Sequence, residues 1–99
     1  MKVFISQPMR NKTDEEILKV RADIKRKLER TYDENVEIID SFFQEAPHEA
    51  KPLWYLGESL KLMSDADLVV FTSDWRSARG CRIERQCAID YGLKMMLMN

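Results

Sequence analysis

The chain has 99 residues, of which 44% are hydrophobic and 33% charged, and its formal net charge is -1. This balance is typical of a single globular domain over residues 1–99, and it argues against a protein that works mainly by neutralising nucleic-acid phosphates. No apolar run approaches the roughly 18 to 20 residues of a membrane span, and the apolar start at residues 1–6 is too short for a signal peptide. We therefore expect a cytoplasmic protein that contacts no membrane.

The first half of the chain predicts a strand, a long helix and a second strand. Residues 1–6 form the first strand, and Thr13 to Glu16 matches a capping box that starts the helix. Apolar positions of this helix recur at three- and four-residue steps, at Ile17, Val20, Ile24 and Leu28. The helix is expected to end within residues 32–34, and the β-branched residues at 36–39 predict the second strand.

The second half continues the alternation of helices and strands. Residues 53–63 predict a helix, residues 67–71 a strand buried on both faces, and residues 94–98 the last strand. A third helix runs from Arg79 or Gly80 to Tyr91 and ends at Gly92. Alternating strands and helices imply parallel pairing through right-handed crossovers, so we expect a three-layer α/β fold. Its parallel sheet should have about four strands in the order 2-1-3-4.

The segment from Asp74 to Glu84 lies where an open α/β sheet binds ligands, because it follows a buried strand and leads into a helix. A helix N-terminus offers free N–H groups to an anion, and Gly80 allows close backbone approach. Four arginines gather in this segment or directly after it, at positions 76, 79, 82 and 85. Guanidinium groups match phosphate oxygens, so Arg79 and its neighbours favour a phosphorylated ligand; the alternative is a solvated charged face.

Polar residues also follow the first two predicted strands. Ser6 and Gln7 are candidates for contact with a sugar or a phosphate, and the alternative is a simple turn with Pro8. Asp40, followed by Ser41, is a candidate hydrogen-bond partner of a ribose or a cap for a local turn. Trp75 is a candidate for stacking on a base or for burial against a neighbouring subunit. Tyr55 and Trp54 have the same two interpretations.

The cysteines and the single histidine argue against a metal site. Cys81 and Cys87 lie six positions apart on one predicted helix and point in different directions, so we expect two reduced thiols. His48 is far from both, and the sequence has no CxxC pair. We expect neither a metal nor a cofactor.

The long irregular stretch at residues 41–51 contains Phe42 and Phe43. Loops of this length are often lids or binding segments; the alternative is that the two phenylalanines cap the core or bury in an interface. A sheet of about four strands leaves edges and helix faces poorly covered, so we expect a homo-oligomer.

Two blocks of the sequence carry a family resemblance. The first is Phe4-Ile5-Ser6-Gln7-Pro8-Met9-Arg10, followed by the capped helix. The second runs from Ser64-Asp65-Ala66-Asp67-Leu68-Val69-Val70 to Gly80-x-x-x-Glu84-x-x-x-Ala88-x-x-x-Gly92. In this order they resemble the nucleoside 2-deoxyribosyltransferase superfamily, most of all a small branch often found in phage and prophage genomes. The resemblance covers nearly the whole chain and implies a flavodoxin-like, Rossmann-like fold.

The resemblance also implies a chemistry. In active relatives a glutamate attacks the anomeric carbon of a nucleoside or nucleotide, and Glu84 occupies that position. The transition state resembles an oxocarbenium ion, which a nearby carboxylate stabilises or traps. Relatives that use nucleotides bind the phosphate with an arginine after the first strand, which Arg10 matches. Glu84 should be ionised at neutral pH, near a helix N-terminus and several arginines. The alternative is that it only pairs with Arg79, Arg82 or Arg85.

The chain departs from the family pattern at two positions. Active relatives carry a base-contacting carboxylate where this chain has Ser59, with Glu58 beside it. Relatives that transfer deoxyribose tend to have an acid six positions before the nucleophile, where this chain has Ala78; Asp74 could replace it only if the loop folds back.

Two functions follow from these residues. The first is N-glycosidic bond cleavage or deoxyribosyl transfer on a 5'-phosphorylated nucleoside, with Ser6, Asp40 and Asp74 orienting the sugar. The alternative is a non-catalytic module that binds a nucleotide-derived ligand or signal. Binding of nucleic acid is not expected, given the net charge and the lack of a recognised motif.

Overall fold

A computed structural model describes residues 1–98 of the chain. Within these residues the strands are β1 (Lys2–Ser6), β2 (Glu37–Ile38), β3 (Leu68–Thr72) and β4 (Met95–Met98). The helices are α1 (Asp14–Tyr32), α2 (Pro52–Met63) and α3 (Arg79–Asp90), with a short 3-10 helix η1 (Trp75–Ser77) before α3. No helix in this part of the chain is long and apolar enough to cross a lipid bilayer.

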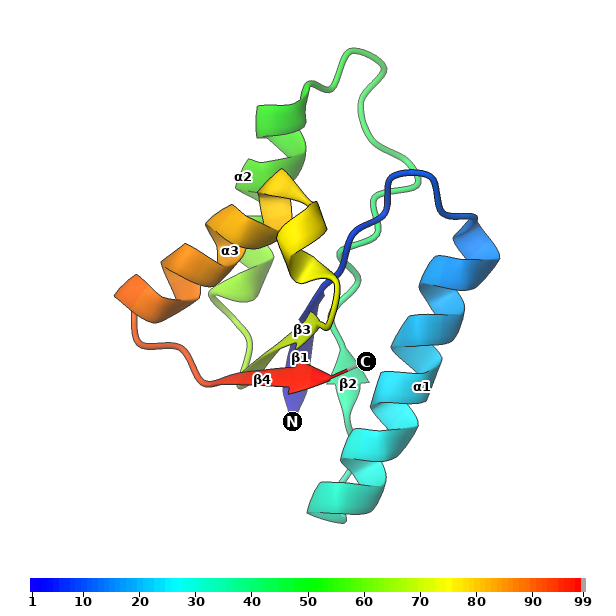
Figure 1. Cartoon of the computed structure of the whole chain (residues 1–99), viewed down its shortest axis with the longest axis vertical. Helices are drawn as coiled ribbons and strands as arrows, with labels where there is room; N and C mark the ends of the chain where they lie inside the picture. The colour runs from blue at the N-terminus through cyan, green and yellow to red at the C-terminus, as the bar shows by residue number, and fades with distance from the viewer. Residues whose placement is uncertain (99) are drawn as a thin grey trace.

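The four strands form one parallel sheet in the order β2-β1-β3-β4. This confirms the order that the alternation of strands and helices predicted. Figure 1 shows α1 on one face of the sheet and α2 and α3 on the other, so the molecule has three layers. The architecture is a flavodoxin-like or Rossmann-like α/β fold.

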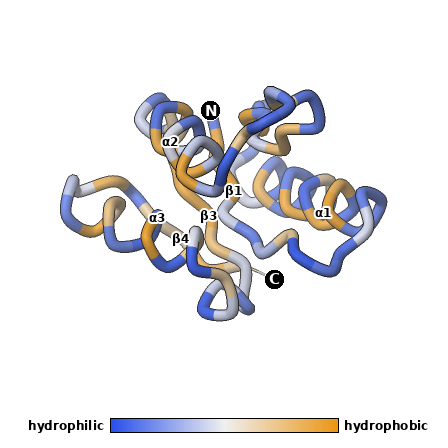
Figure 2. The backbone as a smooth tube through the Cα atoms, turned by 90° about the horizontal axis from the view of Figure 1, so that it is seen from above, coloured by the Kyte–Doolittle hydropathy of each residue, from blue (hydrophilic) through white to orange (hydrophobic). Residues whose placement is uncertain are grey.

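Each face of the sheet has its own hydrophobic core. Successive strand residues point to opposite faces, so β1 and β3 contribute to both cores. On one face, Val3 and Val70 pack with Ile24 and Leu28 of α1. On the other, Phe4, Val69 and Phe71 pack with Met63 of α2 and Ala88 of α3. Hydrophobic colour is accordingly concentrated in β1 and β3 in Figure 2, between the helical layers. Burial on both faces explains why β3 is an unbroken apolar run.

The ends of two helices follow the signals in the sequence. Thr13 Oγ1 accepts a hydrogen bond from the Glu16 amide, and the Glu16 carboxylate accepts one from the Thr13 amide, both at 3.1 Å. This is the predicted capping box at the start of α1. After α3 the chain turns through Gly92 at a φ of 68°, a left-handed conformation that favours glycine.

Each of the four strands differs from its predicted range by one residue at one or both ends, and two of these differences involve specific hydrogen bonds. Of residues 36–39, only Glu37–Ile38 form the strand, although the Ile39 amide still donates to the Val3 carbonyl at 2.9 Å. β3 starts at Leu68 rather than at Asp67, whose carboxylate instead accepts a hydrogen bond from the Lys2 amide at 2.7 Å. Cys81 and Cys87 are both free, as expected.

Candidate functional site

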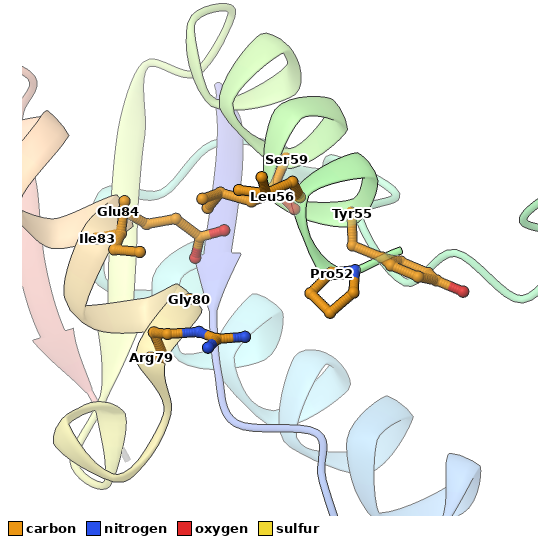
Figure 3. A pocket seen from close by; sticks show the side chains of 9 residues that line it. Pro52, Tyr55, Leu56, Ser59, Arg79, Gly80, Ile83 and Glu84 are labelled. Carbon is orange, nitrogen blue, oxygen red and sulfur yellow. The ribbon is translucent and has the colours of Figure 1, made fainter. Parts of the chain in front are cut away.

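Glu84 lies on α3 with its side chain directed toward the carboxyl end of β1. Ser6, the last residue of β1, donates a hydrogen bond from Oγ to Glu84 Oε1 at 2.6 Å. Only 7% of the Glu84 surface is exposed. In Figure 3 the Glu84 carboxylate points toward Ser59 and Leu56 of α2, so the two helices face each other across this group. The predicted nucleophile is thus a buried carboxylate held in place by one strand and flanked by two helices.

Two cavities meet at Glu84. The α2–α3 cavity has a volume of about 570 Å³ and is lined mainly by apolar side chains of the two helices, with Arg79 at the start of α3. The strand-end cavity has a volume of about 560 Å³ and lies at the segments that follow β1 and β2. The two cavities share Tyr55, Ser59, Gly80 and Glu84. Each volume falls within the range of about 300 to 1,000 Å³ typical of small-molecule sites.

The protonation of Glu84 is governed mainly by its burial. Burial raises the pKa of Glu84, while hydrogen bonds from Ser6 and Ser59 and the positive charge of Arg21 act against this rise. The sequence predicted that a helix N-terminus and the arginines near it would favour the charged carboxylate. The cation that does so is instead Arg21, which lies on α1. Within residues 1–98, Glu84 forms no ion pair with Arg79, Arg82 or Arg85.

Cys81 is a second potential nucleophile close to Glu84. Its thiol is buried beside Ser6 and lines the strand-end cavity. Burial raises the pKa of Cys81 to about 11. The thiol is therefore protonated at neutral pH and weakly nucleophilic, because the thiolate is the reactive form. Of these two side chains, Glu84 therefore remains the candidate nucleophile at the junction of the cavities.

The arginines that precede and begin α3 have different surroundings. Arg79 lines the α2–α3 cavity. Arg82 donates a hydrogen bond to the Arg76 carbonyl at 2.7 Å. The guanidinium carbons of Arg76 and Arg85 lie 5.0 and 4.7 Å from the centre of the Trp75 ring. Only Arg79 of these four lines a cavity that contains Glu84, and Arg10, from the segment after β1, lines the other.

Asp74 and Trp75 lie outside both of these cavities. Thr72 Oγ1 and Lys12 Nζ bond to the Asp74 carboxylate at 2.7 and 2.9 Å, and Asp74 lines a separate cavity of about 220 Å³. The Trp75 ring packs edge-on against Phe71, 6.4 Å between centres. The structure therefore does not bring these two residues together with Glu84, whereas it does bring Ser6, Gln7, Ser59 and Gly80 together with it.

Asp40 and Ser41 are neighbours in sequence but differ in their environment. Asp40 is exposed, and its Oδ1 accepts a hydrogen bond from the Phe42 amide at 3.3 Å. Asp40 thus caps a local turn, which was the predicted alternative to contact with a ribose. Ser41 is buried and lines the strand-end cavity. On α2, Glu58 forms an ion pair with Lys61 at 2.7 Å and lines neither cavity at Glu84.

The start of the 41–51 loop packs on α2 through aromatic rings. The Phe43 ring centre lies 5.6 Å from that of Trp54, and the Trp54 and Tyr55 rings are 5.1 Å apart. Phe42, Phe43 and Tyr55 line the strand-end cavity. The loop therefore forms part of the wall of the candidate site.

Arg21 is a residue of this region that the sequence prediction missed. Its side chain is buried in the middle of α1, where its Nε donates to Gln7 Oε1 at 2.7 Å and a terminal nitrogen to Ser41 Oγ at 3.0 Å. A signal was present in the sequence, because Arg21 lies four residues after Ile17 and three before Ile24. It is a charged residue within the apolar stripe of an amphipathic helix.

No protein-family model, curated protein or solved structure matched this chain when it was compared with them. Its architecture is that of a small α/β fold with four parallel strands in the order 2-1-3-4. Within residues 1–98 there is also no group of three or more His, Cys, Asp or Glu side chains arranged to hold a metal ion.

Proposed function

We propose that this protein binds a nucleoside 5'-phosphate and cleaves its N-glycosidic bond, with Glu84 as the nucleophile. The observation that carries the proposal is the buried Glu84 carboxylate, bonded to Ser6 at the point where two ligand-sized cavities meet. The family resemblance of the sequence supports the same assignment, because Glu84 matches the nucleophile of nucleoside 2-deoxyribosyltransferases.

The proposed reaction has two steps. A Glu84 oxygen attacks the anomeric carbon while the bond from that carbon to the base breaks, and the base leaves with the electron pair and takes a proton from solvent. This forms a sugar ester of Glu84. Water then attacks the anomeric carbon, gives its proton to solvent and frees the carboxylate, which completes hydrolysis. A second base in place of water gives transfer of the sugar.

The two cavities suit different parts of such a substrate. The strand-end cavity carries Arg10 and the polar side chains of Ser6, Gln7 and Ser41, which suit the phosphate and the sugar hydroxyls. The α2–α3 cavity carries Leu56 and Ile83, which suit the flat apolar faces of a base. Arg79 lines the α2–α3 cavity, but its neighbours Ala78 and Gly80 line the strand-end cavity, so its guanidinium would reach the phosphate from the junction of the two. The sugar would then lie at the junction, against Glu84.

A non-catalytic binding module is the second candidate, and the lining of the cavities favours it. Among the described residues that line the two cavities, Glu84 is the one acidic residue. Ser59 is on the base side, and Glu58 is engaged by Lys61. A positioned general acid contributes about 10² to 10⁴-fold to such reactions, so its lack would slow base release. A pocket of this kind could hold a nucleotide-derived signal without turnover.

One experiment separates the two functions. Purified parent protein and a Glu84→Gln variant are incubated with ribo- and deoxyribonucleosides and with their 5'-monophosphates, and free base and bound ligand are followed by mass spectrometry. Base released by the parent and not by the variant supports cleavage by Glu84. Intact ligand retained by both proteins supports the binding module. If no compound is bound or cleaved, both proposals are wrong.

A further inference from the structure

The guanidinium of Arg21 is a buried cation without a countercharge in direct contact. Its exposed fraction is 6%, and within residues 1–98 it forms no ion pair. Asp40 and Glu84 are the carboxylates whose charges act on it from a distance. Burial of an unpaired charge is unfavourable for folding, so its hydrogen-bond partners indicate what this arginine contributes.

Those partners come from two neighbouring strands. Gln7 follows β1 directly, Ser41 lies shortly after β2, and the two strands pair in the sheet. Arg21 donates a hydrogen bond from Nε to Gln7 Oε1 and another from a terminal nitrogen to Ser41 Oγ. The single planar guanidinium therefore holds both side chains. Both side chains are buried and line the strand-end cavity. Arg21 itself lies behind this wall.

The bonds to Arg21 also decide which groups remain available to a ligand. Arginine can only donate, so it uses the amide oxygen of Gln7 and a lone pair of Ser41 Oγ. The Gln7 amide NH₂ and the Ser41 hydroxyl hydrogen are left, and neither donates to a group within residues 1–98. Because the acceptor atoms are occupied, the two side chains offer donors to the cavity.

We propose that Arg21 is a positioning residue that holds Gln7 and Ser41 as paired hydrogen-bond donors for the phosphate oxygens of the ligand. The identity of the ligand rests on the proposed function. The pairing of Arg21 with the two side chains does not. Arg10 lines the same cavity, so its guanidinium would contact the phosphate directly. Arg21 lies behind the cavity wall, where its positive charge attracts the phosphate at a distance and its hydrogen bonds orient the two donors.

The first test needs no ligand. In NMR spectra the Nε proton of Arg21 should exchange with water at least about tenfold more slowly than that of exposed Arg30, because a buried, bonded N–H is protected. Gln7→Ala should remove most of this protection, and Arg21→Lys should shift the side-chain amide signals of Gln7. An Arg21 proton that exchanges as fast as that of Arg30 would overturn the inference, whatever the protein binds.

The second test measures binding of the 5'-monophosphate to which the parent binds most tightly, of its nucleoside and of inorganic phosphate. Arg21→Lys keeps a positive charge but loses the planar group that reaches both partners. We expect this variant to lower the affinity for the monophosphate at least about tenfold and the affinity for the nucleoside less than about threefold. If the parent turns the compound over, KM should rise while kcat changes little. Arg30→Lys, on the exposed face of the same helix, is the control and should leave the affinities for the monophosphate and the nucleoside unchanged.

The outcomes of the second test are distinct. If Arg21→Lys binds the monophosphate and the nucleoside equally more weakly than the parent does, Arg21 only supports the fold of the cavity wall. If Arg21→Lys binds the monophosphate as tightly as the parent does, the charge alone matters. Either result overturns the inference. Weakened binding of inorganic phosphate as well would support the phosphate as the group that is recognised. A parent that binds none of the compounds overturns the phosphate role and the proposed function together, while the exchange measurement still reports on the pairing.

Discussion

Ser6 and Glu84 are 78 positions apart in the sequence, yet Ser6 Oγ and Glu84 Oε1 are joined by a 2.6 Å hydrogen bond. The bond connects the end of β1 to α3, and both residues are buried. It favours the charged carboxylate in a position where burial disfavours it. The relationship therefore combines the position of the candidate nucleophile with control of its ionisation.

Replacement of Ser6 by alanine should move the pH dependence of catalysis. The Ser6 hydroxyl lowers the pKa of Glu84, so its loss should raise that pKa further and shift the acidic limb of kcat/KM to higher pH. We expect activity at neutral pH to fall by about tenfold, the effect of losing one hydrogen bond to a charged group. A pH–rate profile of base release checks this. Ser77→Ala is the control, because it removes a hydroxyl that donates a hydrogen bond to the Asp74 carbonyl, and it should leave the profile unchanged.

Glu84→Gln should abolish base release and stabilise the fold at neutral pH. The pKa of Glu84 is raised by folding, so the native state holds the proton more tightly, and stability declines as pH rises above the ordinary value of 4.5. Glutamine carries no charge and avoids this loss. Thermal unfolding should give the variant a Tm a few degrees higher at pH 7, with the difference shrinking as the pH falls toward 4.5.

Glu58→Gln is the matched control for this measurement. Its carboxylate is paired with Lys61 at 2.7 Å and lies outside the cavities at Glu84, so the substitution should not raise the Tm and should leave turnover unchanged. A stability of Glu84→Gln at or below that of the parent at pH 7 would contradict the prediction that burial penalises the charged carboxylate.

Arg10→Ala and Arg79→Ala should each lower the affinity for a 5'-monophosphate by about ten- to a hundredfold and the affinity for its nucleoside far less. Each substitution removes a guanidinium from a cavity at Glu84. Arg82→Ala is the control, since Arg82 is bonded to the Arg76 carbonyl and lines neither cavity. Titration calorimetry with both compounds gives the comparison. If the three variants lose affinity equally, the arginines act through general charge and not through phosphate contact.

Cys81 should resist alkylation in the folded protein. Its thiol is buried with a pKa of about 11, so little thiolate is present at pH 8. We expect iodoacetamide to modify Cys81 slowly in the native protein and readily after unfolding, as peptide mass spectrometry would report. Cys81→Ala should keep base release within about threefold of the parent. A large loss of activity without a loss of fold would point to a reactive role for the thiol.

We further propose that the protein is a homo-oligomer. Leu53, at the rim of the α2–α3 cavity, is 79% exposed, and Leu97 on the edge strand β4 is 64% exposed. Exposed apolar residues and open sheet edges favour association. Light scattering at micromolar concentration should give a mass above that of one chain, and Leu53→Glu or Leu97→Glu should lower it. The mass of a single chain for the parent would remove the proposal.

The helical period also indicates which arginines of α3 line the site. At about 100° per residue, Arg79, Ile83, Gly80 and Glu84 fall within one arc of about 140°, whereas Arg82 and Arg85 lie outside it. All four residues of the arc line the α2–α3 cavity. The helical period in the sequence therefore separates Arg79 from Arg82 and Arg85, whereas a count of the positive charges near this segment treats them alike. Arg76 precedes the helix and is governed by its contact with Trp75.

The sequence by itself determined the elements and their order in the sheet. Capping residues, hydrophobic period and the apolar run of β3 act over a few positions, and the rules for parallel crossovers then leave few topologies. The tertiary structure alone decided which polar side chains meet. Arg21 bonds residues 14 and 20 positions away, and Ser6 bonds Glu84 across most of the chain. Such contacts depend on how packed layers place side chains in three dimensions, which no local pattern in the sequence specifies.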